Sequence, residues 1–454
     1  MKRITRSSAA RRVATAMAAG ALLAVTLVGC SSGGNTPSGS GSSTGAAAVD
    51  AALKTGGTIT YWTWTPAAQA QVAAFQKAYP KVTVKLVNAG TNTTEYTKLQ
   101  NTIKAGSGAP DVAQIEYGVL PQFALGKSLV DLNTFGFDAL KPDYATGPWG
   151  DVNIANGLWG LPQDSGPMAL FYNKKVFDTY GIAVPTTWDE YVAAAKKLHA
   201  ANPNSYITSD TGDPGLATSM IWQAGGKPFV VDGNNITINL QDQGTKKYTA
   251  VWNKLVEGKL LATIPGWSDD WYKALGNGSI ATLITGAWMP GVLESSVKDG
   301  SGDWRVAPMP TYDGTPTNAE NGGSSQAVIK QSKNQALAAG FVRWLNHDPE
   351  SISIFTKAGG GFPSTTADLT STEFLATAPD YFGGQKINEV LTDGAKNVVS
   401  GFNLLPYQVY ANSIFADTVG KSYVSNSDLN PGLVAWQQQL VDYGNQQGFK
   451  VTSK

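Results

Sequence analysis

Cysteine and histidine are scarce in this chain of 454 residues, which contains one Cys and two His. A single cysteine cannot form an internal disulfide, so the fold must rest on its own apolar core. His199 falls in a Lys-containing segment with helical spacing, and His347 falls at a predicted helix end, so both are expected at solvated surface positions. The pattern argues against a His-based catalytic triad and against a metal cluster.

Arginine is also rare from Cys30 onward, because only Arg305 and Arg343 remain. A phosphorylated ligand would require a cluster of arginines. Five of the 34 basic residues and none of the 34 acidic residues precede Cys30, so the remainder, with 29 basic and 34 acidic side chains, carries a net charge of −5. This mildly acidic balance argues against nucleic-acid binding, which requires basic patches.

The one long apolar run of the sequence lies near its start, at residues 13–28, and is shorter than a membrane span of about 20 residues. Basic residues precede it and small residues follow it, which is the arrangement of a secretory signal peptide. Leu27-Val28-Gly29-Cys30 resembles the lipobox of bacterial lipoproteins. We therefore expect residues 1–29 to be removed and Cys30 to be lipidated, which would hold the chain on the extracytoplasmic face of the cell membrane. An ordinary signal peptide and a retained N-terminal anchor helix are the alternatives.

Residues 30–52 are expected to form the lipidated cysteine and a flexible linker, since residues 31–48 are mainly Gly, Ser, Thr and Ala. The chain that follows the signal peptide is too long for one compact core, which predicts two domains or lobes.

The folded part opens with alternating strand and helix patterns. Strands are predicted at residues 58–63, 82–87 and 111–115, with helices at residues 66–78 and 93–105 between them. This order predicts a parallel sheet with crossover helices, and ligands bind such sheets beyond the carboxyl ends of the strands. The turns expected there are residues 63–65, 89–92 and 116–118.

Later segments also carry clear local signals. Thr187 and Glu190 form a capping-box pattern at the start of a helix over residues 188–200. Residues 230–238 predict a hairpin, and residues 334–345 predict a strongly amphipathic helix. Residues 371–454 are expected to be mainly helical.

Five stretches together resemble one known family, the extracellular solute-binding proteins of family 1, which are sugar-capturing lipoproteins of bacterial ABC importers. The stretches are Gly57–Trp64, Asp164–Lys174, Trp222–Gly226, Gly278–Trp288 and Gly322–Asn334. Their order and spacing carry the resemblance, which covers nearly all of residues 56–445. The sequence departs from the family at Ala281-Thr282, where Ala-Met is usual.

The resemblance implies an α/β fold of the type II periplasmic-binding-protein class, with two lobes joined by a hinge and a ligand cleft between them. The first lobe would contain residues 53–165 and 313–358, whereas residues 166–312 and 359–454 would form the second. The chain would cross between the lobes near Pro162–Pro167, Pro308–Gly314 and Gly359–Pro363. The resemblance also implies a monomer without cofactor, metal or nucleic acid, whose partners are a carbohydrate and the permease subunits of an ABC importer.

Sugars are bound by aromatic platforms together with carboxylate, amide and indole hydrogen-bonding groups. The family commonly uses the aromatic residue after Gly286-Ala287 as a stacking platform, and Trp64 follows the first strand. Trp222 and Trp267 could equally be core residues, since Trp is usually highly buried. Asp164 and Glu116 could equally be turn residues whose carboxylates cap a backbone N–H. The predicted ligand-binding residues are Trp64, Glu116, Tyr117, Asp164, Trp222, Trp267, Trp288, Gly323, Phe362 and Tyr407.

Two other functions compete with sugar capture. A secreted glycoside hydrolase would also need aromatic residues and paired carboxylates, but no hydrolase motif is evident. The same fold could bind a glycerol phosphate or a polyamine. A glycerol phosphate would need an arginine cluster, which this chain lacks, and a polyamine would need several convergent carboxylates. The 13 Trp favour a neutral sugar, and a di- or oligosaccharide over a monosaccharide.

Overall fold

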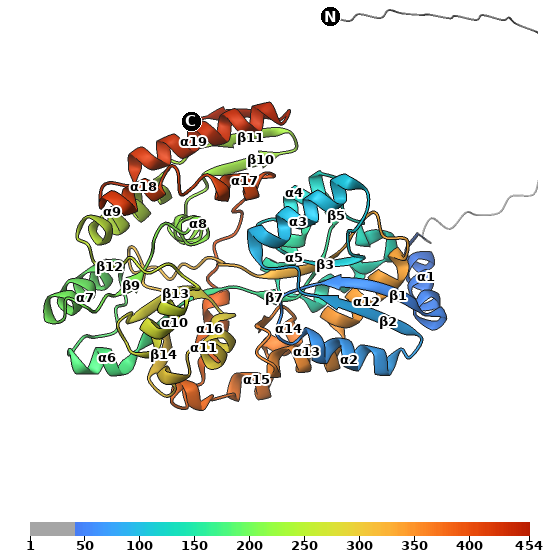
Figure 1. Cartoon of the computed structure of the whole chain (residues 1–454), viewed down its shortest axis with the longest axis horizontal. Coiled ribbons are helices and arrows are strands. Elements are labelled where there is room, and N and C mark those ends of the chain that lie inside the picture. Colours follow the sequence, from blue (N-terminus) through green and yellow to red (C-terminus); the bar gives the residue numbers. More distant parts are fainter. Residues whose placement is uncertain (1–40) are drawn as a thin grey trace, which may run out of the picture. The chain divides into compact units, whose positions relative to one another are not determined.

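The computed structural model describes residues 41–454, whose helices and strands are labelled in Figure 1. The predicted signal peptide, the predicted lipidation site Cys30 and the first part of the predicted linker lie outside these residues. Within residues 41–454, no helix has both the length and the apolar character needed to span a membrane.

The described chain begins with a helix, α1 (Gly41–Thr55), in a segment that we expected to be linker. Val49 and Leu53 of this helix are buried in an apolar core, where α1 packs against α12 (Gln335–His347). The linker prediction was therefore wrong for residues 41–52. The reason is that alanine favours helix, and the Ala-rich end of the segment also supplies the apolar side chains of this contact.

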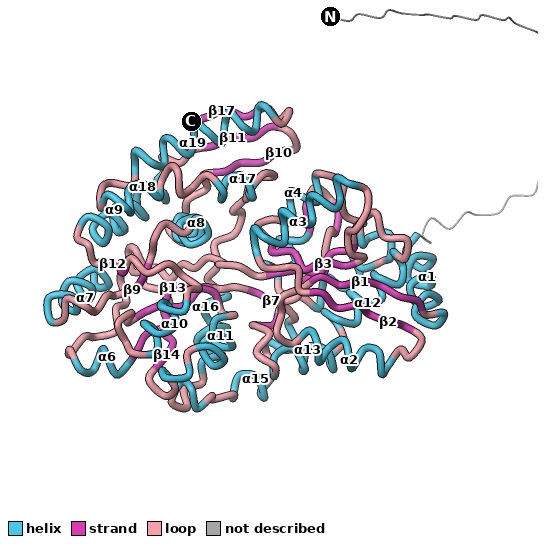
Figure 2. The backbone as a smooth tube through the Cα atoms, viewed as in Figure 1, coloured by secondary structure: helices cyan, strands magenta, loops and turns pink. Residues whose placement is uncertain are grey.

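Lobe 1 is the part of the molecule around the core formed by residues 49–161 and 327–345. Its five-stranded sheet has the order β2-β1-β3-β15-β6. The first three strands are parallel, which confirms the prediction from the alternating pattern, and β15 returns antiparallel to β3. Helices lie on both faces of this sheet (Figure 2). The elements of lobe 1 after α1 are β1 (Gly57–Trp62), α2 (Ala68–Ala78), β2 (Val82–Val87), α3 (Asn92–Ala105), β3 (Val112–Glu116), α4 (Leu120–Leu125), η1 (Leu132–Phe135), η2 (Phe137–Asp143), α5 (Thr146–Val152), β4 (Asn153–Ile154), β5 (Gly157–Leu158), β6 (Leu161–Pro162), β15 (Ser324–Val328), α12 and α13 (Pro349–Lys357).

Lobe 2 surrounds two further cores, and each of them combines residues from 168–319 with residues from 362–451. A three-stranded antiparallel sheet, β13-β8-β14, lies between these cores, and the C-terminal strand β17 joins the predicted hairpin β10-β11. The first elements of lobe 2 are β7 (Asp164–Ser165), β8 (Met168–Asn173), α6 (Lys174–Thr179), α7 (Trp188–Ala201), β9 (Thr208–Ser209), α8 (Pro214–Gln223), β10 (Phe229–Asp232), β11 (Asn235–Ile238), α9 (Gln243–Glu257), β12 (Leu261–Ala262), α10 (Asp269–Gly276), β13 (Thr282–Gly286), α11 (Met289–Ser296), η3 (Lys298–Gly300) and β14 (Trp304–Ala307).

The chain returns to lobe 2 after α13 and ends there. Thr187 and Glu190 make the predicted capping box at the start of α7, and the predicted helical character of residues 371–454 is confirmed in the main. These last elements are β16 (Phe362–Pro363), α14 (Thr366–Leu369), α15 (Thr372–Ala376), η4 (Asp380–Phe382), α16 (Ile387–Ala395), α17 (Gln408–Ser413), α18 (Gly420–Ser425), α19 (Asn430–Gln446) and β17 (Lys450–Ser453).

Three crossing segments connect the lobes side by side. Strands β7 and β16 pair antiparallel, and Pro167 forms an isolated bridge with Glu320. The second crossing lies later in the chain than we predicted. Met309 and Ala319 are buried in a lobe 2 core, so residues 308–314 belong to lobe 2 and the chain crosses at residues 320–323. The Pro and Gly residues that prompted the prediction mark a surface turn instead.

Candidate ligand-binding site

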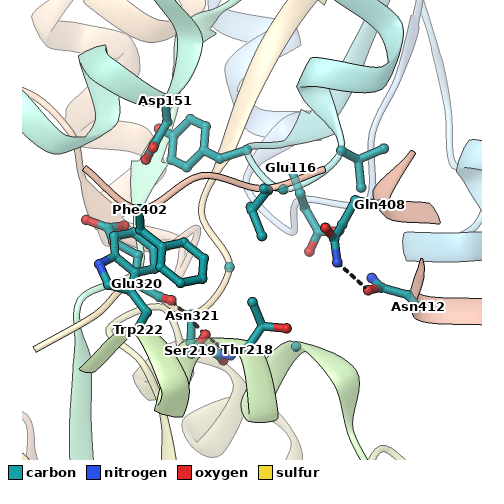
Figure 3. A pocket seen from close by; sticks show the side chains of 16 residues that line it. Glu116, Asp151, Thr218, Ser219, Trp222, Glu320, Asn321, Phe402, Gln408 and Asn412 are labelled. Atoms are coloured by element: carbon teal, nitrogen blue, oxygen red, sulfur yellow. Dashed lines mark hydrogen bonds between the residues drawn. The ribbon is translucent and has the colours of Figure 1, made fainter. Parts of the chain in front are cut away.

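A pocket lies where residues of both lobes meet the second crossing (Figure 3). Lobe 1 contributes the residues that follow β3, as the carboxyl-end rule predicts, and lobe 2 contributes α8 and the segment that enters α17. The lining residues are Glu116, Tyr117, Gly118, Val119, Asp151, Gly215, Thr218, Ser219, Trp222, Glu320, Asn321, Gly322, Phe402, Leu404, Gln408 and Asn412.

One wall of the pocket is a pair of stacked aromatic rings. The rings of Trp222 and Phe402 lie 4.7 Å apart between centroids and are parallel to within 8° (Figure 3). The indole Nε1 of Trp222 donates to the carbonyl oxygen of Val399 at 2.5 Å, which fixes the orientation of the ring. Both side chains are half-buried, so part of this flat apolar surface faces the pocket.

Glu116 brings a carboxyl group to the lobe 1 side of the pocket. Its Oε2 accepts a hydrogen bond from the hydroxyl of Tyr96 at 2.7 Å, and its backbone N–H donates to the same hydroxyl oxygen at 3.0 Å. Burial raises the pKa of Glu116, and the negative charge of Asp213 raises it further. The hydroxyl of Tyr96 opposes these effects, because its hydrogen bond stabilises the ionised carboxylate.

Two more carboxyl groups, those of Asp151 and Glu320, face the pocket from α5 and from the second crossing. Glu320 Oε2 accepts from the backbone N–H of Gly166 at 2.8 Å, and Oε1 accepts from the Ser165 hydroxyl at 3.1 Å. No described residue donates a side-chain or backbone hydrogen bond to the carboxyl of Asp151. Burial raises the pKa of both groups, and the charge of Glu320 raises that of Asp151 further.

Hydroxyl and amide groups complete the polar lining. The Ser219 hydroxyl donates to the carbonyl oxygen of Glu320 at 2.8 Å, and Asn321 Nδ2 donates to that hydroxyl oxygen at 3.2 Å. On the opposite side, Gln408 Nε2 donates to Asn412 Oδ1 at 2.9 Å. The pocket therefore offers hydrogen-bond donors as well as acceptors, held in place by their neighbours.

Asp164 has a structural position next to the pocket, outside its lining. The residue is 6% exposed, and its Oδ1 accepts from the backbone N–H of Ser324 at 2.7 Å. The Tyr117 hydroxyl donates to the carbonyl oxygen of Asp164 at 2.6 Å. Burial raises the pKa of the Asp164 carboxyl well above its ordinary value. These contacts tie the first crossing to the second and to the end of β3.

Trp288 and Trp267 lie beside the second crossing, outside the pocket lining. Trp288 is half-buried and donates from Nε1 to the carbonyl oxygen of Asn321 at 2.7 Å. Trp267 is 55% exposed and stacks on Trp288 with ring centroids 5.8 Å apart. Its φ of +68° is unusual for a residue with a side chain. The two indoles form an accessible aromatic surface that shares Asn321 with the pocket.

Gly323 has a φ of +94°, and a Cβ there would lie 2.7 Å from the ring of Tyr117. We expected Gly323 to let the backbone approach the sugar closely. In the structure, the backbone at Gly323 lies close to the ring of Tyr117 instead. Trp64 packs partly on the lobe 1 core, and its ring meets that of Tyr96 edge-on with centroids 6.3 Å apart. Tyr96 in turn donates its hydroxyl to Glu116.

Phe362 and Tyr407 are buried away from the pocket lining. Phe362 is 2% exposed and packs edge-on against Phe374, and Tyr407 is 4% exposed and donates its hydroxyl to the carbonyl oxygen of Leu440 at 3.1 Å. We do not retain either residue in the candidate site. Among residues 41–454, no group of three or more His, Cys, Asp or Glu side chains is arranged to hold a metal ion.

The sequence did not point to several of the lining residues, namely Asp151, Thr218, Ser219, Glu320, Asn321, Phe402 and Asn412. One signal was available, since Thr218 and Ser219 are polar positions in the mainly apolar helix α8. The others lie at helix ends, on a crossing and in a loop. Polar residues are common in such segments, so nothing in the sequence marks these as binding residues.

Comparisons with known proteins match this architecture over most of the chain. The family model described as bacterial extracellular solute-binding protein matches residues 61–350. An ABC-transporter-associated binding protein from B. animalis subsp. lactis, solved in complex with β-1,6-galactobiose, is 45% identical and has a TM-score of 0.82, covering 87% of this chain and 99% of that chain. The galacto-N-biose/lacto-N-biose I-binding protein from Bifidobacterium longum, solved with lacto-N-biose, is 28% identical with a TM-score of 0.76, covering 88% and 99%.

Among curated proteins, the arabinooligosaccharide-binding protein of Halalkalibacterium halodurans is 24% identical over 370 residues, which are 77% of this chain and 80% of that protein. The structural matches confirm the expected type II periplasmic-binding fold, in which two α/β lobes flank a ligand cleft. The chain therefore belongs to the bacterial extracellular solute-binding proteins of family 1, which bind solutes outside the cytoplasm and are not enzymes.

Proposed function

We propose that this chain captures a di- or oligosaccharide outside the cytoplasm and delivers it to the membrane permease of an ABC importer, while lipid on Cys30 holds it at the membrane. The observation that carries the proposal is the pocket wall formed by Trp222 and Phe402, flanked by hydrogen-bonding groups from both lobes. Aromatic faces of this kind complement the apolar C–H faces of sugar rings. The 45% identical relative solved with β-1,6-galactobiose supports the same ligand class.

In the proposed mode of binding, hydroxyl groups of the sugar donate to Glu116 and Asp151, and accept from the amides of Asn321 and Asn412. Because these groups belong to different lobes and to a crossing, a bound sugar would link the lobes across the pocket. The crossings would then act as the hinge about which the lobes close. Trp288 and Trp267 would extend the aromatic surface for a longer saccharide.

A polyamine is a second candidate ligand, because three carboxyl groups line the pocket. The stacked rings favour the saccharide, since their apolar faces offer a linear polyamine less contact than they offer a sugar ring. A hydrolase is set aside, because the family consists of binding proteins.

The proposal is tested by the melting temperature of residues 31–454, which lack the predicted signal peptide and the lipidated cysteine, with each of β-1,6-galactobiose, lacto-N-biose, lactose and spermidine at about 1 mM. A ligand that binds with micromolar affinity stabilises the folded state by about 4 kcal/mol at a thousandfold excess over Kd. We expect a shift with at least one sugar, and chromatography should recover that sugar unchanged. A shift with spermidine alone would favour the polyamine, and cleavage of the sugar would contradict the proposal.

A further inference from the structure

We infer that the pocket selects its saccharide by charge and excludes sugars that carry a carboxylate, sulfate or phosphate group. The inference rests on the proposed function, because it specifies which saccharides the same pocket accepts. It follows from the charges of the lining residues, from the hydrogen bonds that these residues already make, and from the burial of the site.

The charged side chains of the pocket are all of one sign. Glu116, Asp151 and Glu320 line it, and no Lys, Arg or His among the described residues does so. Asp164 adds a fourth carboxyl group directly behind the lining, on the first crossing. Lys227 approaches Gly401, next to Phe402, but it does not reach the lining. An anionic group on the ligand would therefore meet repulsion without a neutralising partner.

The hydrogen bonds inside the site point the same way. Glu320 is held by donors from the first crossing, and one oxygen of Glu116 is occupied by Tyr96. Asp151 has no donor among the described residues, although its side chain is half-buried and faces the pocket (Figure 3). The oxygens of Asp151 are therefore free to accept a hydrogen bond from the ligand. A sugar hydroxyl supplies a proton to it, whereas a carboxylate or sulfate oxygen can only accept.

Burial makes the mismatch larger than it would be at an exposed surface. The pKa values of Glu116, Asp151 and Glu320 are all raised, chiefly because these carboxyl groups are withdrawn from water, so the site disfavours a negative charge on any group that it encloses. A carboxylate of the ligand would lose its hydration in the same way, and each lining group that stays ionised would repel it at the effective dielectric constant of about 20 that suits protein sites. We expect the two effects together to weaken binding by more than a factor of ten.

The test compares two disaccharides that differ at one group, β-1,6-galactobiose and the acid in which its free 6-hydroxymethyl group is oxidised to a carboxylate. Isothermal titration calorimetry of residues 31–454 measures the ratio of the two affinities. We expect the acid to bind at least tenfold more weakly. Asp151→Asn, which keeps the shape of the side chain and removes its charge, should reduce that ratio at least threefold. Glu116→Gln provides the same comparison if the first variant does not fold.

The matched control is Asp189→Asn, which removes the same charge from a side chain that is 85% exposed on lobe 2. This variant should leave the ratio unchanged. Binding of the acid within twofold of the neutral sugar would overturn the inference, and so would a ratio that neither pocket variant reduces, because the discrimination would then be steric. Failure of galactobiose, lacto-N-biose and lactose alike to bind would contradict the proposed function itself, which distinguishes the two failures.

Discussion

Glu95 on α3 is a carboxyl group buried inside lobe 1, and its replacement by glutamine should change how the stability of the protein depends on pH. The side chain has no exposed surface, and neither of its oxygens accepts a hydrogen bond from the described residues. Burial raises its pKa to about 8, the charge of Glu116 raises it as well, and Lys98 partly opposes the change. The folded state therefore keeps this proton when the unfolded chain has already lost it.

This difference in proton binding determines whether stability rises or falls with pH. A carboxyl group whose pKa is higher in the folded state adds no penalty below its ordinary value of 4.5, and its ionisation destabilises the fold increasingly as the pH rises toward 8. A tenfold difference in proton affinity is worth about 1.4 kcal/mol. Between about pH 5.5 and about pH 8.5, the titration of Glu95 should lower the free energy of unfolding by about 3 kcal/mol.

Urea denaturation followed by tryptophan fluorescence, at several pH values across this window, measures the effect in the wild-type chain and in Glu95→Gln. The glutamine cannot titrate, so the variant should lose about 3 kcal/mol less stability than the wild type over the window. Glu373→Gln, at a side chain that is 84% exposed, is the control and should follow the wild type. Parallel pH profiles for the wild type and Glu95→Gln would refute the reasoning, because they would mean that Glu95 is hydrated or partnered in solution.

Three further predictions concern the site and the anchor. Gly323→Ala should destabilise the empty protein by about 1–3 kcal/mol in urea denaturation, because alanine is strained at this φ and its Cβ would press on Tyr117; wild-type stability would contradict this. Phe402→Ala should weaken saccharide binding about tenfold to a hundredfold in calorimetry, because it removes one ring of the stacked wall, and unchanged affinity would place the sugar elsewhere. Cys30→Ser should move the protein from the membrane fraction to the soluble fraction and abolish labelling by radioactive palmitate, whereas retention at the membrane would favour an uncleaved N-terminal anchor.

Local sequence signals predicted the parts of the fold that local physics determines. The β-branched and aromatic residues of the first strand, the alternation at residues 82–87, and the capping box at Thr187 and Glu190 each depend on residues within one element. The order of these elements was enough to predict the parallel sheet β2-β1-β3. Composition was a weaker guide, because the Gly and Ser content of residues 31–48 concealed the start of α1, whose stability comes from burying Val49 and Leu53 against α12.

The position of the second crossing shows a related limit. Pro and Gly are frequent both in crossings and in surface turns, so residues 308–314 matched either interpretation. Their contacts decide between the two, since Thr311 pairs with Thr187 and Met309 is buried in lobe 2. The chain crosses instead where Glu320 reaches back to Ser165 and Gly166 of the first crossing.

Some residues of the site were also predictable from local sequence, whereas others depend on tertiary contacts. Glu116 and Tyr117 were predictable, because the end of a parallel strand is a place defined by the sheet itself. Asp151 and Glu320 were not, because they lie far apart in the chain and only the crossings bring them together. Burial raises the pKa of both groups, and the charge of Glu320 raises that of Asp151 further, so ionising both in the empty pocket is unfavourable. Glu320 has a structural role, because it accepts hydrogen bonds from Ser165 and Gly166. Asp151 has no donor among the described residues, so it is the carboxyl group that a ligand hydroxyl would stabilise.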